Sequence, residues 1–271
     1  MSHVAVVGNL ARDRVDGGPP QPGGCPFFAA YALRAIGGAG HILTRCADAD
    51  RPLFEGPVAA LGVPVTILPA SHTSGFDHTY AGEVRSTTVT EIGDAWTPAD
   101  AAHLDPEVQW VHVAPLLRSD FPADAVAALA EQGRRVSLDA QGLVRAPRLG
   151  PLVQDAAFDP RVLEAVSVLK LSEEEAAIVA GGRFDAATAR SLGVAEILVT
   201  LGSHGEDVWV DGVATHVPTT PVLGVETTGA GDAFMVAYVS ARHDGASPVE
   251  AAGAGSALVA TMLAERRGSR P

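Results

Sequence analysis

Short apolar segments alternate with amphipathic segments along most of the chain. Residues 4–8 read VAVVG, and residues 26–36 read PFFAAYALRAI, in which apolar positions recur at helical spacing before Gly37-Gly38. The first pattern is typical of a buried strand, and the second predicts a helix that glycine ends. Strands that alternate with helices indicate βαβ units and a parallel sheet.

The alternation continues to the end of the sequence. Further strands are predicted at residues 42–45, 63–68, 108–113, 135–139, 166–171 and 197–200. Further helices are predicted at residues 53–61, 124–132, 162–165, 173–180, 232–242 and 248–264. Residues 207–209 and 214–217 are expected to pair as a hairpin around Asp211-Gly212.

Residues 71–95 interrupt this rhythm. They are polar, β-branched and rich in turn residues, which predicts antiparallel strands around Ala81-Gly82. No low-complexity linker and no internal repeat divides the sequence. We therefore expect one domain over residues 1–271, with a small β excursion from residues 71–95 and a second contribution from residues 9–22.

Composition and charge narrow the class of protein. The chain has 271 residues, 47% of them hydrophobic, so it can bury a sizeable core. Its net charge of −13 argues against a nucleic-acid partner, and it means that any anionic ligand must be held by local groups. Lys170 is the sole lysine, and the sequence contains no P-loop motif.

We expect a protein of the reducing cytoplasm that does not associate with a membrane. Cys25 and Cys46 are too few for a disulfide framework. No apolar run is long enough to span a bilayer, and the N-terminal segment resembles a first strand more than a secretory signal. Although Cys25 lies beside two glycines, no His/Asp arrangement near it is readable, and we interpret it as a packing residue.

The stretch Gly229-Ala230-Gly231-Asp232 carries the most specific chemistry. Glycines let the backbone approach a ligand closely, and the first N–H groups of a helix lack partners within it. Such a helix start suits the phosphates of a nucleotide or the charge that develops in phosphoryl transfer. Asp232, in the first turn, is placed to accept a proton from an attacking hydroxyl. The plain alternative is that Asp232 caps the helix and the glycines only make a turn.

Two further loops are candidates for ligand contacts. Leu201-Gly202-Ser203-His204-Gly205 follows a predicted strand that ends at Thr200, and ligands of open α/β sheets bind beyond such strand ends. In the N-terminal part, Asp13 precedes Gly23-Gly24 and a helix, an arrangement that suits a polyol or sugar. Asp13 is otherwise a solvated loop residue, and each glycine-rich stretch an ordinary loop.

These stretches, in this order, resemble the ribokinase-like (PfkB) carbohydrate kinase family over essentially the whole chain. Glu226-Thr227-Thr228-Gly229-Ala230-Gly231-Asp232 is similar to the family's Asp-Thr-x-Gly-Ala-Gly-Asp motif. Its Thr-x-Gly-x-x-Gly loop matches Thr200, Gly202 and Gly205. Its Gly-Gly pair and the earlier aspartate match Gly23, Gly24 and Asp13.

The resemblance implies a fold, an activity and roles for residues. The fold would be a Rossmann-like α/β three-layer sandwich, with a mostly parallel central sheet and a small β lid near residues 9–22 and 71–95. The reaction would be transfer of the ATP γ-phosphate to an alcohol with Mg²⁺, with room for a monovalent cation. By carry-over, Asp232 would be the general base, and Gly229, Ala230 and Gly231 the anion hole. The nucleotide would contact Thr200, Gly202, Gly205 and Thr228, and the acceptor would contact Asp13, Gly23 and Gly24.

Three positions depart from the family pattern. Phe28 stands where the family usually has an asparagine that contacts the sugar. The Asn-x-x-Glu motif linked to Mg²⁺ appears as Ser172-Glu173-Glu174-Glu175, which keeps Glu175 as a residue that would act on the metal through water. Glu226 replaces the first aspartate of the tail motif.

The stretches LDAQGLVR (138–145) and LKLSEEEA (169–176) are similar to those of myo-inositol kinases in this family. Gln141 and Arg145 would then lie near the acceptor or the phosphates, although Arg145 is equally suited to a surface ion pair. We therefore expect a cyclitol or sugar kinase, and a homodimer is compatible with the family.

Two alternatives remain open. One is a nucleoside kinase, with Phe27, Phe28 or Phe76 as a platform for the base. The other is a nucleotide-binding sensor that has lost turnover, which the Phe28 and Ser172 departures favour.

Overall fold

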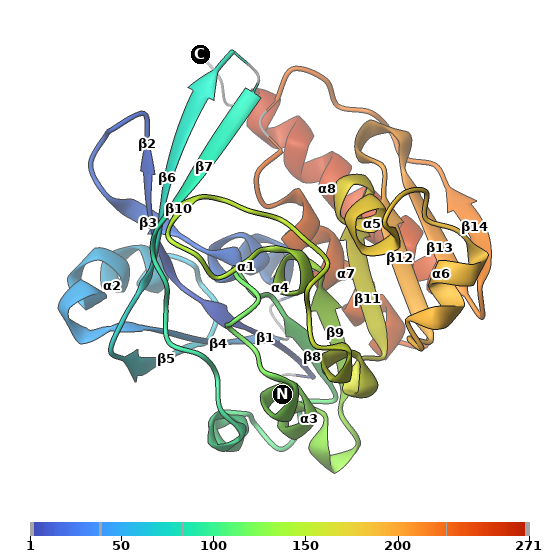
Figure 1. The fold of residues 1–271 in the computed structure, drawn as a ribbon, viewed down its shortest axis with the longest axis horizontal. Coiled ribbons are helices and arrows are strands. Elements are labelled where there is room, and N and C mark those ends of the chain that lie inside the picture. The colour runs from blue at the N-terminus through green and yellow to red at the C-terminus, as the bar shows by residue number, and fades with distance from the viewer. Residues whose placement is uncertain (1–2, 38–39, 83, 226, 269–271) are drawn as a thin grey trace.

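The computed structural model describes residues 3–37, 40–82, 84–225 and 227–268, which form two sheets and their helices (Figure 1). The larger sheet has nine strands in the described residues, and it extends from β14 at one edge to β5 at the other. Its spatial order is β14 (Val213–Val217), β13 (Glu206–Val210), β12 (Glu196–Thr200), β11 (Val168–Ser172), β9 (Arg135–Asp139), β8 (Trp110–Val113), β1 (Val4–Asn9), β4 (Gly40–Ala47) and β5 (Val65–Ala70). Neighbouring strands are parallel from β12 to β5, and β13 and β14 are added antiparallel.

A smaller, mostly antiparallel sheet of five strands lies beside β1 and α1 (Figure 1). Its spatial order is β10 (Gly150–Pro151), β7 (Val84–Glu91), β6 (Ser74–Ala81), β2 (Ala11–Val15) and β3 (Gln21–Gly23). β6 and β7 form the hairpin predicted for residues 71–95, and β2 pairs in parallel with β6. Segments that are far apart in the sequence therefore share one sheet.

Helices cover both faces of the larger sheet. One face carries α1 (Cys25–Ala35), α7 (Ala230–His243) and α8 (Pro248–Gly268). The opposite face carries α3 (Ala123–Leu129), α5 (Glu173–Ala180) and α6 (Ala186–Ser191). The remaining helical segments are α2 (Arg51–Ala59), α4 (Gln141–Val144) and the 3₁₀ turns Asp48–Asp50, Pro98–His103, Glu131–Gly133, Pro160–Ala165 and Gly202–His204.

The first strand explains why the sheet lies in the middle. All of β1 is buried, with Val4 and Val6 packed among α1, α7 and α8 and with Ala5 and Val7 packed toward α3 and α5. Side chains alternate between the two faces of a strand, so a continuous apolar run can be buried only between two layers. This confirms both the parallel α/β sheet that the alternating pattern predicts and the three-layer arrangement that the resemblance implies.

The predicted elements are largely confirmed, with boundaries shifted by no more than four residues. The predicted helix at 162–165 is a 3₁₀ turn, and α4, α6, β2, β3 and β10 were not predicted as separate elements. These elements are short, and two of them depend on pairing with distant strands, so local periodicity carries little signal for them. In the part of the chain that the structure describes, no helix has the length and apolarity needed to cross a membrane.

Candidate active site

Two adjacent parallel strands bring an aspartate and the sole lysine together. β9 ends at Asp139, and its neighbour β11 places Lys170 directly opposite in register. The Lys170 Nζ donates to Asp139 Oδ2 at 3.3 Å, and both side chains are buried, with 8% and 1% of their surface exposed. A buried ion pair at the carboxyl ends of strands marks this edge of the sheet as the place for chemistry.

Helix α7 begins at the same edge. Gly229 precedes it in the left-handed conformation with φ of 79°, and a Cβ at this position would overlap the ring of Phe28. The Ala230 amide donates to Thr227 O at 3.0 Å, so this amide is already used in a turn. No described residue accepts from the amides of Gly229 or Gly231, and they are the donors best placed to hold an anion at the helix start.

Asp232 lies in the first turn of α7 and is buried, with 7% of its surface exposed. Burial, and after it the neighbouring charge of Asp139, raises the pKa of this carboxyl to about 7. Its Oδ1 has no hydrogen-bond partner among the described residues. An aspartate with a pKa near neutrality and an unused oxygen is suited to accept a proton.

Cys25, the first residue of α1, is buried and connects the Gly23-Gly24 pair to Asp232. Its thiol lies close enough to the Asp232 carboxyl for each group to shift the pKa of the other. Burial, followed by the charges of Asp232 and Asp139, raises the pKa of the Cys25 thiol well above its usual range. The thiol therefore stays protonated, which agrees with its interpretation as a packing residue and places it against the candidate base.

Lys170 supplies a fixed positive charge beneath the helix start. A Cβ at Gly231 would lie 2.9 Å from the Lys170 Nζ, so the ammonium group lies against the backbone of this glycine. Burial disfavours its charge, but the carboxylates of Asp139, Glu175 and Asp232 outweigh that cost and raise the pKa of Lys170 above its ordinary value. A buried ammonium group that stays charged beside two available amides can stabilise negative charge.

Glu175 lies in the first turn of α5 and is also buried. Its carboxylate accepts from the Ser172 amide at 2.8 Å, while Ser172 Oγ accepts from the Glu175 amide at 3.2 Å. Ser172 thus caps α5 by this reciprocal arrangement, at the position where the resemblance implies an asparagine. Burial, and then the charge of Asp139, raises the pKa of Glu175.

These carboxylates fit Mg²⁺ only as part of a larger ligand set. The described residues include no cluster of three or more His, Cys, Asp or Glu side chains that could hold a metal ion. Mg²⁺ usually keeps several waters and binds through one or two carboxylates together with substrate phosphates. The chemistry of this donor set therefore suits Glu175, with Asp139 nearby, as a group that orients metal-bound water.

The candidate acceptor-binding residues lie around Gly23. Asp13 lies on β2 opposite Gln21 of β3, and a Cβ at Gly23 would overlap the Asp13 carboxylate. Gly24 caps α1, and Cys25 follows it against Asp232. The candidate acceptor residues Asp13, Gly23 and Gly24 are therefore connected to the candidate base through three consecutive positions.

Gln141 begins the short helix α4, and Arg145 follows its last residue. Arg145 is half-buried, and its positive charge lowers the pKa of Asp232 and of Glu175, which places it beside the charged cluster. No described carboxylate forms an ion pair with Arg145, so the surface ion-pair alternative is not what the structure shows. The backbone N–H of Gln141 donates to Asp139 Oδ1 at 3.4 Å, which places Gln141 directly beyond β9.

The candidate nucleotide loop follows β12. Thr200 pairs with Ser172 across the parallel strands, and Thr200 Oγ1 donates to Leu171 O at 3.3 Å. A bond from the Leu201 amide to Gly205 O, 2.8 Å long, closes the loop around the turn that begins at Gly202. Thr228 lies before α7, and its carbonyl accepts from Arg266 Nη1 at 2.8 Å. Glu226 lies outside the described residues.

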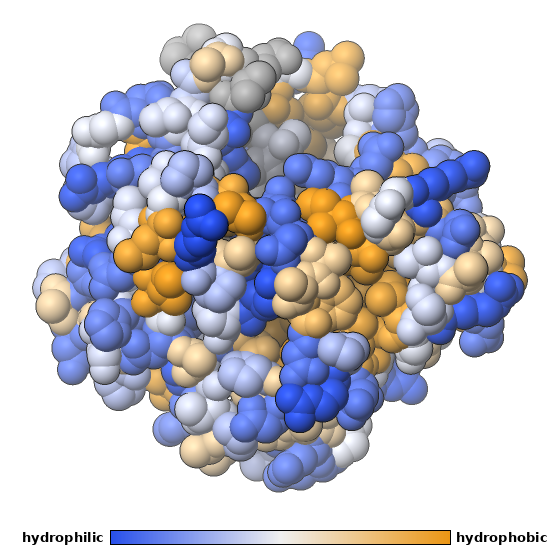
Figure 2. All heavy atoms as spheres, viewed as in Figure 1, coloured by the Kyte–Doolittle hydropathy of each residue, from blue (hydrophilic) through white to orange (hydrophobic). Residues whose placement is uncertain are grey.

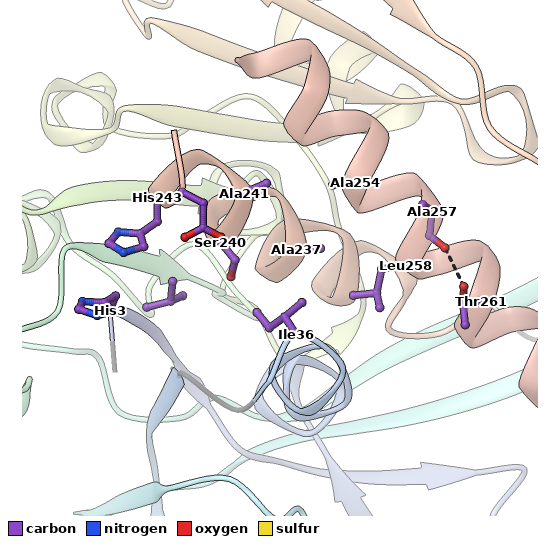
Figure 3. A pocket seen from close by; sticks show the side chains of 12 residues that line it. His3, Ile36, Ala237, Ser240, Ala241, His243, Ala254, Ala257, Leu258 and Thr261 are labelled. Atoms are coloured by element: carbon purple, nitrogen blue, oxygen red, sulfur yellow. Dashed lines mark hydrogen bonds between the residues drawn. The ribbon is translucent and has the colours of Figure 1, made fainter. Parts of the chain in front are cut away.

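A cavity of about 620 Å³ lies at the other end of the sheet, away from this cluster. Figure 3 shows it between the C-terminal end of α7 and α8, where small side chains such as Ala237, Ala241 and Ala257 line it. The rings of His3 and His243 stack at its side, with centroids 4.7 Å apart. Despite its volume, this cavity contains none of the candidate site residues, because it opens at the amino ends of the parallel strands.

Comparison with known proteins agrees with the geometry at the carboxyl ends. A family model described as "pfkB family carbohydrate kinase" matches residues 76–271. The chain belongs to the PfkB family. The family match includes the candidate base, the helix start of α7, the loop after β12 and the Asp139–Lys170 pair.

The PfkB relatives act on small polyhydroxy compounds. A fructokinase from Klebsiella pneumoniae is 27% identical and is matched over 88% of this chain and 83% of that protein. An inositol 3-kinase from Oryza sativa subsp. japonica is 26% identical and is matched over 90% of this chain and 62% of that protein. A pyrophosphate-dependent kinase in the ribokinase family, solved with a pyrophosphate analogue and myo-inositol, is 25% identical and superposes with a TM-score of 0.82 over 96% of this chain and 95% of that one.

Reasoning from the sequence missed three members of the buried cluster. Asp139 and Lys170 were not singled out as site residues, and Cys25 was not connected to Asp232. Two signals were available, because the sole lysine of an acidic chain stands in a predicted strand and Asp139 ends another. Their adjacency depends on the strand order, which places β9 beside β11 in the larger sheet. In the sequence, 28 residues lie between Asp139, the last residue of β9, and Val168, the first residue of β11.

Proposed function

We propose that this PfkB protein is an ATP-dependent kinase that phosphorylates a hydroxyl of a small polyol or sugar, with a cyclitol such as myo-inositol as the favoured acceptor. The observation that carries the proposal is Asp232, a buried carboxyl with a pKa of about 7 that adjoins both the α7 start and the acceptor side of the site. The fructokinase and inositol 3-kinase relatives support the class of acceptor. The cytoplasmic location and the homodimer remain predictions.

Residues of this chain can accept the proton of the attacking hydroxyl and stabilise the negative charge on the transferred phosphoryl group. The hydroxyl oxygen forms a bond to the terminal phosphorus of the donor while its proton passes to the Asp232 carboxylate. The bond from phosphorus to the bridging oxygen breaks, and ADP leaves with that oxygen. The amides of Gly229 and Gly231 and the Lys170 ammonium stabilise the negative charge on the transferred group.

Residues around this centre would position the reactants. Asp13, Gly23 and Gly24 would hold the acceptor, with Gln141 and Arg145 on its other side. Thr200, Gly202, Gly205 and Thr228 would contact the nucleotide, and the smaller sheet would act as the lid. Glu175 would hold Mg²⁺ through water, and the metal would supply positive charge that offsets the charge of the donor phosphates.

Pyrophosphate is a second candidate donor. The related pyrophosphate-dependent kinase, similar over nearly all of this chain, is the specific reason to consider it. Lys170 and Arg145 supply cations for a phosphate group whether or not a nucleoside is attached to it. Steady-state turnover with ATP and with pyrophosphate, at matched acceptor concentration, distinguishes the two donors.

Two of the three phenylalanines that could stack on a nucleoside base pack against other residues of the protein. Phe76 is buried in the smaller sheet, and Phe27 packs near Phe54 with ring centroids 6.5 Å apart. Phe28 lies against Gly229 and remains the one candidate of the three that borders the site. The sensor alternative predicts ATP binding without transfer to any acceptor.

The decisive experiment measures phosphate transfer to a panel of polyols, sugars and nucleosides by wild type and by Asp232→Asn. We expect the variant to lose about 10³-fold in turnover, because it cannot accept the proton, and to keep its thermal shift with ATP. Ser240→Ala is the matched control, because Ser240 lies on the same helix at the opposite end and donates only to Val236 O. An Asn variant as active as wild type would contradict the proposal, and ATP binding without transfer would favour the sensor.

A further inference from the structure

One face of the smaller sheet continues from the hydrophobic core to the acceptor side of the site. Asp13 of β2 lies opposite Phe76 of β6, and His78 follows two residues later on the same face. Phe76 packs in a buried cluster that includes Cys25 and Leu117. Since Cys25 also contacts Asp232, this face borders the reacting centre.

Asp13 is held in place but has no hydrogen-bond donor. Its carboxylate packs against the Gly23 backbone, where no Cβ can be accommodated. No described residue donates a hydrogen bond to it, and its side chain is 21% exposed. The Oδ1 of this fixed carboxylate is buried without a partner, which is costly unless a ligand supplies the donor.

His78 is fixed on two sides and has one nitrogen unused. Its Nδ1 is 3.0 Å from Thr87 Oγ1 on the paired strand, and its ring stacks on Phe76 with an interplanar angle of 11°. Its Nε2 points toward Asp13 but stops 3.9 Å from Oδ2, too far for a direct hydrogen bond. The Nε2 and the Asp13 carboxylate are therefore adjacent polar groups that do not hydrogen-bond to one another. When Nδ1 accepts from the Thr87 hydroxyl, Nε2 carries the proton and can donate.

We propose that His78 is a specificity-determining residue, which acts with Asp13 to bind two neighbouring hydroxyl groups of the acceptor. One hydroxyl donates to the Asp13 carboxylate, and the other accepts from His78 Nε2–H. This inference rests on the proposed function for the identity of the acceptor class, since it assigns to the smaller sheet the recognition of a vicinal diol. A fixed donor–acceptor pair discriminates strongly against an analogue that lacks one hydroxyl, because the pair is then left unsatisfied.

The test measures acceptor binding separately from phosphate transfer. Calorimetric titration without donor compares myo-inositol and D-fructose on wild type, His78→Ala, His78→Gln and Thr79→Ala. We expect His78→Ala to weaken binding of the acceptor that wild type prefers by about 10-fold, the effect of one lost hydrogen bond to a fixed partner. His78→Gln, whose amide can donate from a similar position, should recover most of the affinity. Thr79 is exposed and points to the opposite face of β6, so Thr79→Ala should bind as wild type does.

A deoxy acceptor separates recognition from loss of structure. Among singly deoxygenated analogues of the preferred acceptor, one should bind wild type and His78→Ala with equal affinity, because it lacks the hydroxyl that His78 contacts. Equal binding of the complete acceptor by wild type and His78→Ala would overturn the inference, as would absence of binding of either polyol to wild type. Binding that depends on His78 without any transfer would uphold the inference and contradict the kinase proposal instead.

Discussion

The two ends of helix α7 lie in contrasting surroundings. Its first turn lies among buried charges, with Lys170 beneath Gly231 and with Asp232 against Asp139 and Cys25. Its last turns border a cavity of about 620 Å³, lined mainly by small apolar side chains and flanked by stacked imidazole rings. A sizeable cavity therefore lies at the end of α7 that holds none of the candidate site residues. Perturbed pKa values, available backbone amides and strand polarity locate the candidate site better than volume does.

The surface and the net charge of the protein bear on how an anionic donor can be bound. The face shown in Figure 2 is mostly hydrophilic, with hydrophobic side chains gathered in small patches near its middle. With a net charge of −13, the protein does not attract an anionic donor through its overall field. The local cations Lys170 and Arg145 must supply that attraction at the α7 start, and the amino end of the sheet has no equivalent pair among its cavity-lining residues.

Replacing Lys170 should lower activity more than any other change predicted here except the replacement of Asp232. We expect Lys170→Met to lower kcat by about 10²-fold, because a charge that stabilises the transferred phosphate is lost. Since Lys170 also lowers the pKa of Asp232, the midpoint of the pH–rate profile should move to higher pH. Steady-state kinetics over pH 5.5 to 9 (roughly the range in which a base of this kind titrates) measure both effects. A fall in rate with an unmoved midpoint would show that Lys170 matters only for structure.

The pH dependence of the wild type should report Asp232 directly. Its pKa in the folded protein is raised to about 7, so the carboxyl remains protonated, and unable to act as a base, at lower pH. We expect kcat/KM to be constant above this value and to fall about tenfold for each pH unit below it. Measurement of kcat/KM for the preferred acceptor tests this, and a profile that is flat from pH 5 to 7 would contradict the assignment of Asp232 as the base.

Filling the cavity at the other end should have the smallest effect. Ala241→Leu places extra methyl groups in open space between α7 and α8, so kcat and KM should stay within about twofold of wild type while Tm changes by no more than a few degrees. The same kinetic assay and a thermal unfolding curve measure these quantities. A tenfold loss of activity would show that the two ends of α7 are energetically coupled, which the contrast between them does not predict.

The sequence alone determined the class of fold and the nature of the candidate base. Continuous apolar runs such as residues 4–8 can be satisfied only between two covering layers, and the regular return of helices forces parallel pairing. Gly229-Ala230-Gly231-Asp232 carries its chemistry within four neighbouring positions, so local reasoning finds the helix start and the carboxylate together. The match to the PfkB family model confirmed the resemblance that these motifs carry.

Only the tertiary structure decided which distant residues meet. Asp139 and Lys170 are neighbours because β9 and β11 pair, and His78 faces Asp13 because β6 pairs with β2. Neither pairing leaves a local pattern, since register and strand order are set by packing across the whole sheet. The pKa of Asp232 likewise depends on burial and on charges brought from other elements, which no window of sequence around it contains.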